Sequence, residues 1–438
     1  MSSGARVAVA LALGSFALYN ANVREISSQD TIPARVLPIE LIRHQRLDLD
    51  RLFRDWPASD PLPYWVQHIE GHHQSSYPIA PAILAAPIYL VPVLAGVGES
   101  WVVFNGLSKL AASLMAALSV AFVYLAARAM ASPADGHGPL VAALTYMAAT
   151  TTWSVSSQGL WGHAPAQLGL AVALFALAGS PTGLRLGVAG LVAGLMVASR
   201  PTSAVAAAIL GAYALCRRPR ASLWYWAVAV TVLFAVFAHN LTTFGSWQGG
   251  YAWINRSHDV LHGVKGGAAW STPLASGLAG ILVSPNRGLL VYSPVLALGL
   301  AGLGWGAWRR GGLFTPAALL VGATLLLFGH YSVWWGGHTF GPRLLGDILP
   351  AVALGFVPMW RRLWRPGVGR VLAVLLLSWS VAVQAVGAFY YPSPRDVDWD
   401  ITPQDVDQVH ERLWDWRDSQ LLRLLQNGPA SPGFRTTP

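Results

Sequence analysis

The sequence predicts an all-α, polytopic membrane protein. Of its 438 residues, 54% are hydrophobic and only 11% are charged, whereas soluble domains carry about 25% charged residues. Long apolar stretches recur along the chain and alternate with short polar gaps. A fold in water could not hide so much apolar surface, so lipid is the expected solvent for much of the chain.

The apolar stretches predict roughly 11 to 13 membrane helices, because a helix needs about 20 residues to cross the hydrocarbon core. The first stretch fits either a signal peptide or a retained helix, and the lack of a clean cleavage site after it favours the helix. The stretches are 5–20, 79–97, 103–130, 139–157, 165–179, 187–216, 223–241, 289–308, 314–330, 344–360 and 371–391.

Arginine clusters in three short gaps predict the orientation. The positive-inside rule assigns these gaps to the cytoplasmic side. Loops 21–78, 242–288 and 331–343 and the tail 392–438 are then expected outside, and residues 1–391 form the transmembrane unit. The clusters are Arg217, Arg218 and Arg220, then Arg309 and Arg310, then Arg361, Arg362, Arg365 and Arg370.

The first half of the chain leaves three topologies open. If 21–78 and 158–164 both lie outside, an even number of helices must cross the membrane between them. The apolar stretches predict an odd number there. Stretch 79–97 is re-entrant, or 187–216 is two helices broken at Pro201, or 158–164 is not outside. Proline makes the break plausible, because it removes a backbone donor and clashes with the preceding turn.

Composition and motifs exclude several functions. The net charge of +9 comes almost wholly from arginine, much of it in short gaps, so no basic domain for nucleic acid remains. Cys216 is the only cysteine, so no intramolecular disulfide can form. The chain has no Gly-Lys-Ser/Thr phosphate loop and no convincing Rossmann fingerprint.

The first polar loop, 21–78, holds the strongest candidate for chemistry. Asp30 lies about ten residues after the first apolar stretch and precedes a short amphipathic run that begins near Pro33. One interpretation makes Asp30 the N-cap of that helix. The other makes it a general base that the neighbouring Arg35 holds ionised.

These features resemble the GT-C superfamily of integral-membrane glycosyltransferases. An early carboxylate, a short amphipathic helix and Tyr77-Pro78-Ile79-Ala80 are similar to the first loop of protein mannosyltransferases and lipid-A aminoarabinose transferases. Ile79 and Ala80 depart from the usual Pro-Gly of that motif. Four further strings, at or between the apolar stretches, extend the resemblance over about 20–350: Ser157–His163, Ala198–Thr202, Ser284–Pro294 and Trp334–Arg343.

The resemblance implies a lipid-linked donor and an acceptor on the outer face. Asp30 matches the position of the family's first-loop carboxylate and would take the acceptor's proton. The leaving phosphate needs cationic partners, for which arginine is suited. We expect Arg287 and Arg343 to bind it, with Arg35 and Arg200 as further candidates, although interfacial arginines also extend to lipid head groups without a catalytic role.

Other polar residues are weaker candidates for contact with substrate. His72 and His73, with Glu70, could ligate a divalent metal, or could be ordinary loop histidines. Trp334 and Trp335 beside His338 could stack on a sugar or belong to the interfacial aromatic belt. Tyr77 and His163 are the remaining substrate candidates. An Arg343–Asp347 pair at one-turn spacing would be structural.

The polar tail, 392–438, is expected to contain an amphipathic helix from about 403 to 426. Val406, Val409, Leu413 and Trp416 repeat at helical spacing. Such a helix would lie along the outer membrane surface or against the loops.

The sequence therefore predicts a glycosyltransferase of the bacterial cytoplasmic membrane that uses a polyprenyl-phosphate sugar. Two other functions stay open at this stage. A transporter or lipid-linked sugar flippase would need polar groups at mid-membrane and symmetrically broken helices. A non-catalytic assembly protein would keep the fold after losing the chemistry.

Overall fold

The computed structural model describes residues 2–57, 59–257, 261–264 and 268–437. In these residues the protein is a helical bundle with one small hairpin, so the all-α prediction is confirmed. The longer helices are α1 (Ser3–Asn20), α2 (Ile32–His44), α3 (Ala80–Leu94), α4 (Trp101–Met130), α5 (Gly138–Ala148), α6 (His163–Leu177), α7 (Gly183–Ser199), α8 (Ala204–Arg217), α9 (Ser222–Phe244), α12 (Leu274–Val283), α14 (Leu296–Arg310), α15 (Phe314–His330), α17 (Phe356–Leu363), α18 (Val368–Tyr390) and α19 (Gln420–Asn427).

Short elements join these helices. The hairpin pairs β1 (Val66–Ile69) with β2 (His72–Ser75) in antiparallel register. The short α-helices are α10 (Tyr251–Arg256), α13 (Leu289–Tyr292) and α16 (Leu349–Leu354). The remaining turns of helix are η1 (Gln29–Thr31), η2 (Pro133–Asp135), η3 (Thr152–Ser156), η4 (Pro201–Ser203), η5 (Arg343–Ile348) and η6 (His410–Trp414).

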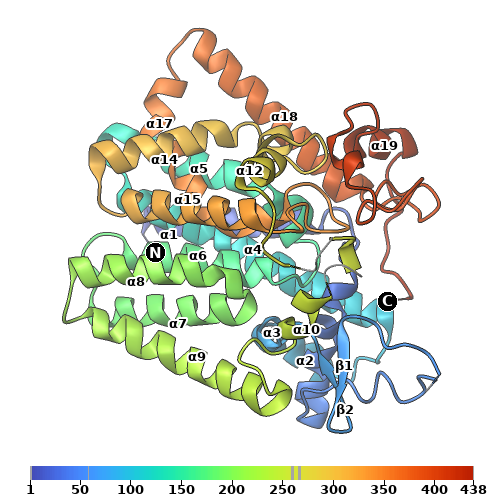
Figure 1. Ribbon diagram of the computed structural model, residues 1–438. Coiled ribbons are helices and arrows are strands. Elements are labelled where there is room, and N and C mark those ends of the chain that lie inside the picture. The colour runs from blue at the N-terminus through green and yellow to red at the C-terminus, as the bar shows by residue number, and fades with distance from the viewer. Residues whose placement is uncertain (1, 58, 258–260, 265–267, 438) are drawn as a thin grey trace.

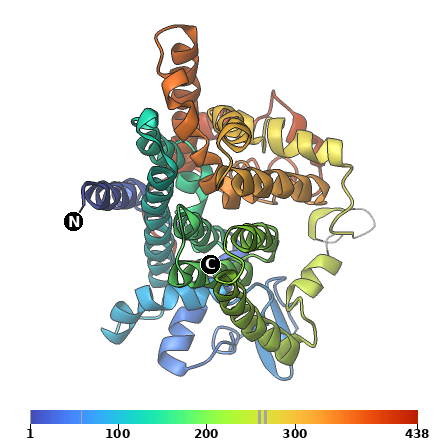
Figure 2. The same cartoon turned by 90° about the vertical axis from the view of Figure 1, so that its left-hand side faces the viewer.

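The two ends of the bundle differ in character (Figure 1). The hairpin, α10, α19 and the marked C-terminus lie at the right-hand end, whereas the arginine-bearing α8–α9 and α14–α15 connections lie at the left. Figure 2 shows the bundle from that left-hand side, with α1 at one edge and the hairpin at the opposite, lower edge. The long polar loops and these two arginine-bearing connections are therefore at opposite ends of the bundle, whereas the α17–α18 connection lies at the top of the view.

Among the described residues, three helices, α4, α9 and α18, are long and apolar enough to cross a membrane in one piece. A fourth candidate is the bent pair Arg343–Leu354 and Phe356–Leu363, whose halves meet at 60°. Six further apolar helices have 10 to 17 residues. Lipid-facing side chains of α9 are exposed along its length, as expected for a helix at the edge of a membrane bundle.

Prolines and glycines divide several apolar stretches that looked continuous. Stretch 187–216 is two helices, α7 and α8, separated at Arg200 and Pro201, which is one of the three topologies left open above. Stretch 289–308 breaks into α13 and α14 around Pro294, and stretch 344–360 into η5, α16 and α17. Proline explains the first of these two corrections, because it lacks the amide that a continuing helix requires, whereas α16 and α17 meet at Gly355.

Small residues bring helices α7 and α9 close together. A Cβ added at Gly190 would lie 2.1 Å from the carbonyl oxygen of Tyr225. Helices α12 and α15 meet in the same way, at Gly277 and Gly329. Such backbone contact is how membrane helices associate when lipid removes the hydrophobic drive between them.

The prediction of one amphipathic helix over 403–426 is wrong. The chain runs through turns to η6 and then to α19, which begins at the N-cap Ser419. The carbonyls of Arg412 and Leu413 accept hydrogen bonds from the side chains of Asn286 and Ser284, which hold this part of the tail against loop 242–288. Of the apolar side chains that suggested helical spacing, Val406 and Leu413 are fully buried, whereas Trp416 is 63% exposed.

Candidate active site

Asp30 lies in η1 and receives hydrogen bonds from three sides. Its carboxylate accepts from the hydroxyls of Ser28 and Tyr64, each at 2.8 Å. Arg343 Nη1 lies 3.1 Å from the other carboxylate oxygen. Asp30 is not the N-cap of α2, because Thr31 occupies that position without a capping hydrogen bond. The cation beside Asp30 is Arg343, and not Arg35 as the sequence suggested.

The environment of Asp30 keeps it ionised. Burial alone would raise the pKa of this carboxyl, but the charge of Arg343 and the hydrogen bonds from Ser28, Tyr64 and Arg343 outweigh that effect. The pKa is therefore lowered from its ordinary value of 3.8. The side chain is still 21% exposed, so it lies in a recess that a small group can reach.

Arg343 is held in place by its surroundings and keeps one donor unused. Its guanidinium lies over the ring of Trp161, 4.5 Å from the centroid, and Nη2 donates to the carbonyl of Gly336 at 2.6 Å. Trp161 is itself anchored by a hydrogen bond to the carbonyl of Ile26. Among the described residues, Arg343 Nε has no acceptor, so the side chain can bind a further anionic oxygen.

A second ion pair lies nearby and joins three helical elements. Arg200 Nε is 2.6 Å from Asp347, and His163 Nδ1 is 2.8 Å from the other oxygen of the same carboxylate. The structural Arg343–Asp347 pair expected from one-turn spacing is wrong. Residues 343–348 form a 3-10 helix, in which side chains three apart, and not four apart, share a face.

Tyrosines connect the two ion pairs. The rings of Tyr64, Tyr77 and Tyr251 follow one another at centroid distances of 6.5 and 5.7 Å. Tyr251 experiences the charges of Asp30, Arg343, Arg200 and Asp347, so both pairs lie within one electrostatic neighbourhood. Burial and the charge of Asp30 raise the pKa of Tyr64 and Tyr77 well above 10.0, and both hydroxyls therefore stay protonated as donors.

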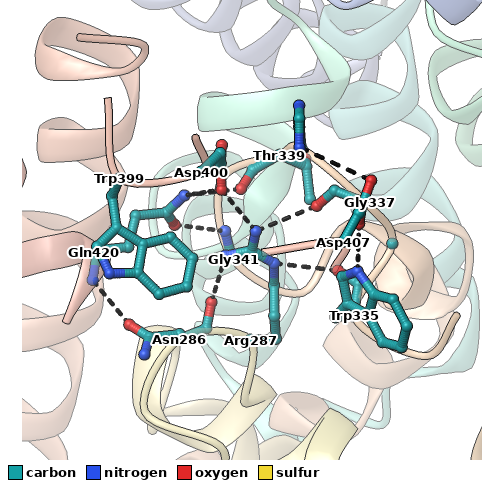
Figure 3. A network of polar contacts seen from close by, with 12 residues as sticks. Asn286, Arg287, Trp335, Gly337, Thr339, Gly341, Trp399, Asp400, Asp407 and Gln420 are labelled. Atoms are coloured by element: carbon teal, nitrogen blue, oxygen red, sulfur yellow. Dashed lines mark hydrogen bonds and ion pairs between the residues drawn. The ribbon is translucent and has the colours of Figure 1, made fainter. Parts of the chain in front are cut away.

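Arg287 lies in a buried network that involves the tail (Figure 3). Its three nitrogens donate to the carbonyls of Trp335, Asn286 and Gly337, and Nη2 also contacts Asp400 at 2.8 Å. The side chain is only 1% exposed. Contrary to the sequence-based expectation, this geometry favours a structural role over contact with a donor phosphate.

His72 and His73 lie on β2 and both contact Asp50, and not Glu70. The Nδ1–carboxylate distances are 2.7 Å for His72 and 3.2 Å for His73. Glu70 is in the hairpin turn with a positive φ of 50°. The hydrogen bonds of both histidines to Asp50 connect the hairpin to the part of the first loop that follows α2.

Trp334, Trp335 and His338 border the tail. Trp335 is buried and donates its indole N–H to Asp407 at 2.6 Å. Trp334, Trp335 and His410 line a cavity of about 350 Å³. His338 Nε2 lies 2.8 Å from Asp405 and 3.7 Å from Asp407. The two indoles are thus packed under the tail, although their edges reach the cavity.

Three groups in the described chain have the side chains to hold a metal ion: Glu40, His44 and Glu99; Asp48, Asp50 and His72; and His338, Asp405 and Asp407. Arginines already neutralise the first two groups, through Arg43 and Arg51 on Glu99 and through Arg46 on both aspartates. In the third group the ion-pair partners of Asp405 and Asp407 among the described residues are histidines. None of the three groups includes Asp30.

Several residues of the site were invisible to sequence reasoning. Tyr64 and Tyr251 lie in long polar segments with no periodicity. Trp161 was one of 20 tryptophans, without a local signal that separates it from belt residues. Asp347 was noticed, but its partners Arg200 and His163 are 147 and 184 residues away along the chain. The only sequence signal for Asp347 is that a charged residue lies at the start of an apolar stretch, where an unpaired charge would be costly.

Comparison with solved structures identifies the architecture. The crystal structure of the Archaeoglobus fulgidus oligosaccharyltransferase with Zn and sulfate matches at a TM-score of 0.53 and 14% identity, over 94% of this chain and 57% of that chain. The same enzyme tethered to an acceptor peptide matches at 0.53 and 14%, over 94% and 58%. The chain has a GT-C fold.

The comparisons leave the activity open. ArnT from Cupriavidus metallidurans gives a TM-score of 0.49 at 13% identity, over 88% of this chain and 75% of that chain. The present chain spans little more than half the length of the oligosaccharyltransferase. No protein-family model matches the sequence, and no curated protein matches it either. At these identities the likeness establishes the fold, as the sequence resemblance predicted, and the chemistry must come from the site.

The Arg287 network makes a prediction about stability. Arg287→Met should lower the free energy of unfolding by about 3–5 kcal/mol, because Asp400 would stay buried without its cation. Arg287→Met combined with Asp400→Asn should recover much of that loss. Thermal unfolding in detergent measures both, with the exposed Arg309→Met as the control. Unchanged stability combined with weaker donor binding would instead place Arg287 in the substrate site.

Proposed function

We propose that the protein transfers a sugar from a polyprenyl-phosphate donor to an acceptor at the outer face of a bacterial cytoplasmic membrane. The observation that carries this proposal is the Asp30–Arg343 pair, an ionised and partly exposed carboxylate beside a cation whose buried Nε has no acceptor among the described residues. Asp30 belongs to the long first loop and Arg343 to loop 331–343, and the long loops lie at one end of the bundle. That position favours transfer over transport, which would need polar groups at mid-membrane.

Each charged group has a role in the proposed reaction. Asp30 takes the proton of the acceptor hydroxyl as its oxygen attacks the anomeric carbon of the sugar. The bond from that carbon to the phosphate oxygen breaks, and the lipid phosphate leaves with the electron pair. Arg343 stabilises the charge that develops on the phosphate, and Arg200 is the second cation within the same neighbourhood.

The ion pair also suggests how donor binding prepares the base. In the free protein Asp30 is held by Arg343 at 3.1 Å, and a carboxylate with a lowered pKa is a weak base. A donor phosphate competes for the same guanidinium. When Arg343 turns its donors to the phosphate, the pKa of Asp30 rises toward its ordinary value, and the carboxylate becomes a better proton acceptor.

Aromatic side chains supply a surface for the sugar. Tyr77 lies between Tyr64 and Tyr251, and these rings present both apolar faces and hydroxyl donors, the combination that suits carbohydrate. His163 supports the site indirectly, because it holds Asp347 opposite Arg200.

A divalent metal fits best at His338, Asp405 and Asp407. Imidazole and carboxylate donors suit zinc or manganese, and no arginine pairs with either aspartate among the described contacts. A metal there would fasten the tail to loop 331–343 beside the active site, since the charge of Asp407 reaches Tyr64. The proton transfer and phosphate departure described above involve only Asp30 and the arginines.

Asp30→Asn should abolish the general base without removing the recess. The turnover number is expected to fall by roughly 10²–10⁴-fold, the usual contribution of a positioned base. A glycosyl-transfer assay with a synthetic polyprenyl-phosphate sugar would measure it, and Asp60→Asn, an exposed change in the same loop, is the control. Full turnover in folded Asp30→Asn protein would disprove the proposed chemistry.

Arg343→Ala should weaken binding of the lipid-linked donor by roughly tenfold or more, the loss of one charge-assisted contact. Binding of a polyprenyl-phosphate analogue to protein in nanodiscs gives the dissociation constant. Arg395→Ala removes an exposed tail arginine and should leave that constant unchanged. Equal affinity in both variants would remove Arg343 from the donor site.

The competition for Arg343 predicts a difference between two pH profiles. The acidic limb of kcat/KM reports the free enzyme, where the pKa of Asp30 is below 3.8. The acidic limb of kcat reports the donor complex and should lie at higher pH, because the phosphate has drawn Arg343 away. Both kcat and kcat/KM therefore fall on acidification, but kcat falls at a higher pH than kcat/KM. Coincident limbs would mean that Arg343 stays on Asp30 throughout.

A further inference from the structure

A group of buried cations lies between helices α1, α2 and α4, behind the first loop. Arg24 follows α1, Arg35 is in α2 and Lys109 is in α4. Their residues are only 6%, 3% and 2% exposed. In addition, the charge of Arg435 from the tail acts on both Arg24 and Arg35.

Glu25 is the one carboxylate that the described contacts place among these cations, and it does not neutralise them. Its two oxygens accept hydrogen bonds from Ser27 at 2.6 Å and Ser108 at 3.3 Å. Arg35 Nη1 approaches it only to 4.0 Å. Three buried cations therefore share a single, otherwise engaged carboxylate, which is an unfavourable arrangement in a medium of low dielectric constant.

Several N–H and O–H groups around this cluster also lack acceptors. Within the described chain, Arg24 Nε and Nη2, Arg35 Nε and the hydroxyl of Tyr89 have no hydrogen-bond partner. Tyr89 is fully buried in α3 and interacts electrostatically with Arg35 and Glu25, so it belongs to the same region. Buried donors of this kind are normally satisfied, and a local group of four requires an acceptor.

Arg287 shows how the same fold treats a buried arginine that needs no ligand. Each of its nitrogens donates to a protein acceptor, and Asp400 supplies the counter-charge. Among the described residues, Arg24 has neither an acceptor for Nε or Nη2 nor an ion-pair partner. The contrast within one chain indicates that the missing acceptor and the missing negative charge at Arg24 belong to something that binds there.

We infer that Arg24, Arg35 and Lys109 bind a phosphate-type oxyanion at a site separate from the catalytic recess. A tetrahedral oxyanion supplies both the negative charge and the several acceptor oxygens that guanidinium and ammonium groups prefer. Arg35 directs its other donors to Asn105 and to the carbonyl of Ser28, and among the described contacts it makes no ion pair with Asp30, whose cation is Arg343. Such a group is either free phosphate or the head group of an anionic lipid.

The tail covers this oxyanion site. Gly433 donates its amide to the carbonyl of Val23 at 2.9 Å, and Asn105 donates to the carbonyl of Arg435 at 3.2 Å. Both contacts are next to the cations, because Val23 precedes Arg24 and Asn105 accepts a hydrogen bond from Arg35. The tail segment 433–435 would therefore lie beside the bound group. An occupied site would therefore also hold this segment against α4.

Thermal unfolding of the full chain tests the inference without any transfer assay. The measurements use the Arg343→Ala background, so that phosphate bound at the catalytic recess contributes little. In nanodiscs of phosphatidylcholine, inorganic phosphate should raise Tm relative to chloride at equal ionic strength, as expected for a ligand of the folded state. Because the readout is stability, failure here would leave the proposed transfer reaction untouched.

Two variants and one matched control test whether phosphate binds at this cluster of cations. Arg24→Gln and Lys109→Met should each weaken the apparent phosphate affinity at least tenfold. Arg128→Met removes an exposed cation from the other end of the same helix, α4, and should leave it unchanged. If Lys109→Met does not fold, Arg24→Gln, which lies outside the helix, carries the test.

The lipid arm identifies the source of the oxyanion. If an anionic head group binds, nanodiscs of phosphatidylglycerol raise Tm without phosphate, and added phosphate contributes nothing further. If free phosphate binds, it raises Tm in both lipids. Either result, when lost in Arg24→Gln, supports the site. A Tm that responds to neither probe, or responds equally in Arg24→Gln, overturns the inference.

Discussion

The ion pair between Asp30 and Arg343 is the contact on which the proposed active site depends. It joins residues 313 positions apart and so connects the first loop to the start of the bent segment that contains α16. Tyr64 and Ser28 donate hydrogen bonds to the carboxylate of Asp30, and the ring of Trp161 packs against the guanidinium of Arg343. Without this pair, a carboxylate and a cation would each lie in a partly buried recess without compensation.

Charge compensation distinguishes the regions of this structure. In the catalytic recess the two carboxylates, Asp30 and Asp347, are matched by Arg343 and Arg200. Around Arg287 the match is complete and the side chain is inaccessible. Around Arg24, Arg35 and Lys109 the positive charge is in excess and donors are unused. An accessible ion pair with matched charges can take part in a reaction, and a buried ion pair with matched charges can stabilise the fold. A buried cluster with excess positive charge can bind an anionic ligand.

The sequence identified several site residues but not their partners. Asp30, Arg343, Arg200 and His163 were all candidates, and the structure brings them into one neighbourhood. Arg287 was a candidate for the same reason as Arg343, an arginine in an outer loop before an apolar segment. The two differ only in what surrounds them: Arg287 meets Asp400 and carbonyls from the folded tail, whereas Arg343 meets Asp30. No local pattern carries that difference, because the contacting residues are far away along the chain.

The sequence by itself determined the solvent, the helical class and the end of the bundle where polar loops collect. These follow from composition, apolar length and arginine placement, which act locally and require no knowledge of partners. Only the tertiary structure decided where apolar stretches break, that the tail folds into turns over the loops, and which cation pairs with Asp30. Those outcomes depend on hydrogen bonds such as Ser284 to Leu413 and Arg343 to Asp30, which form only when distant segments meet.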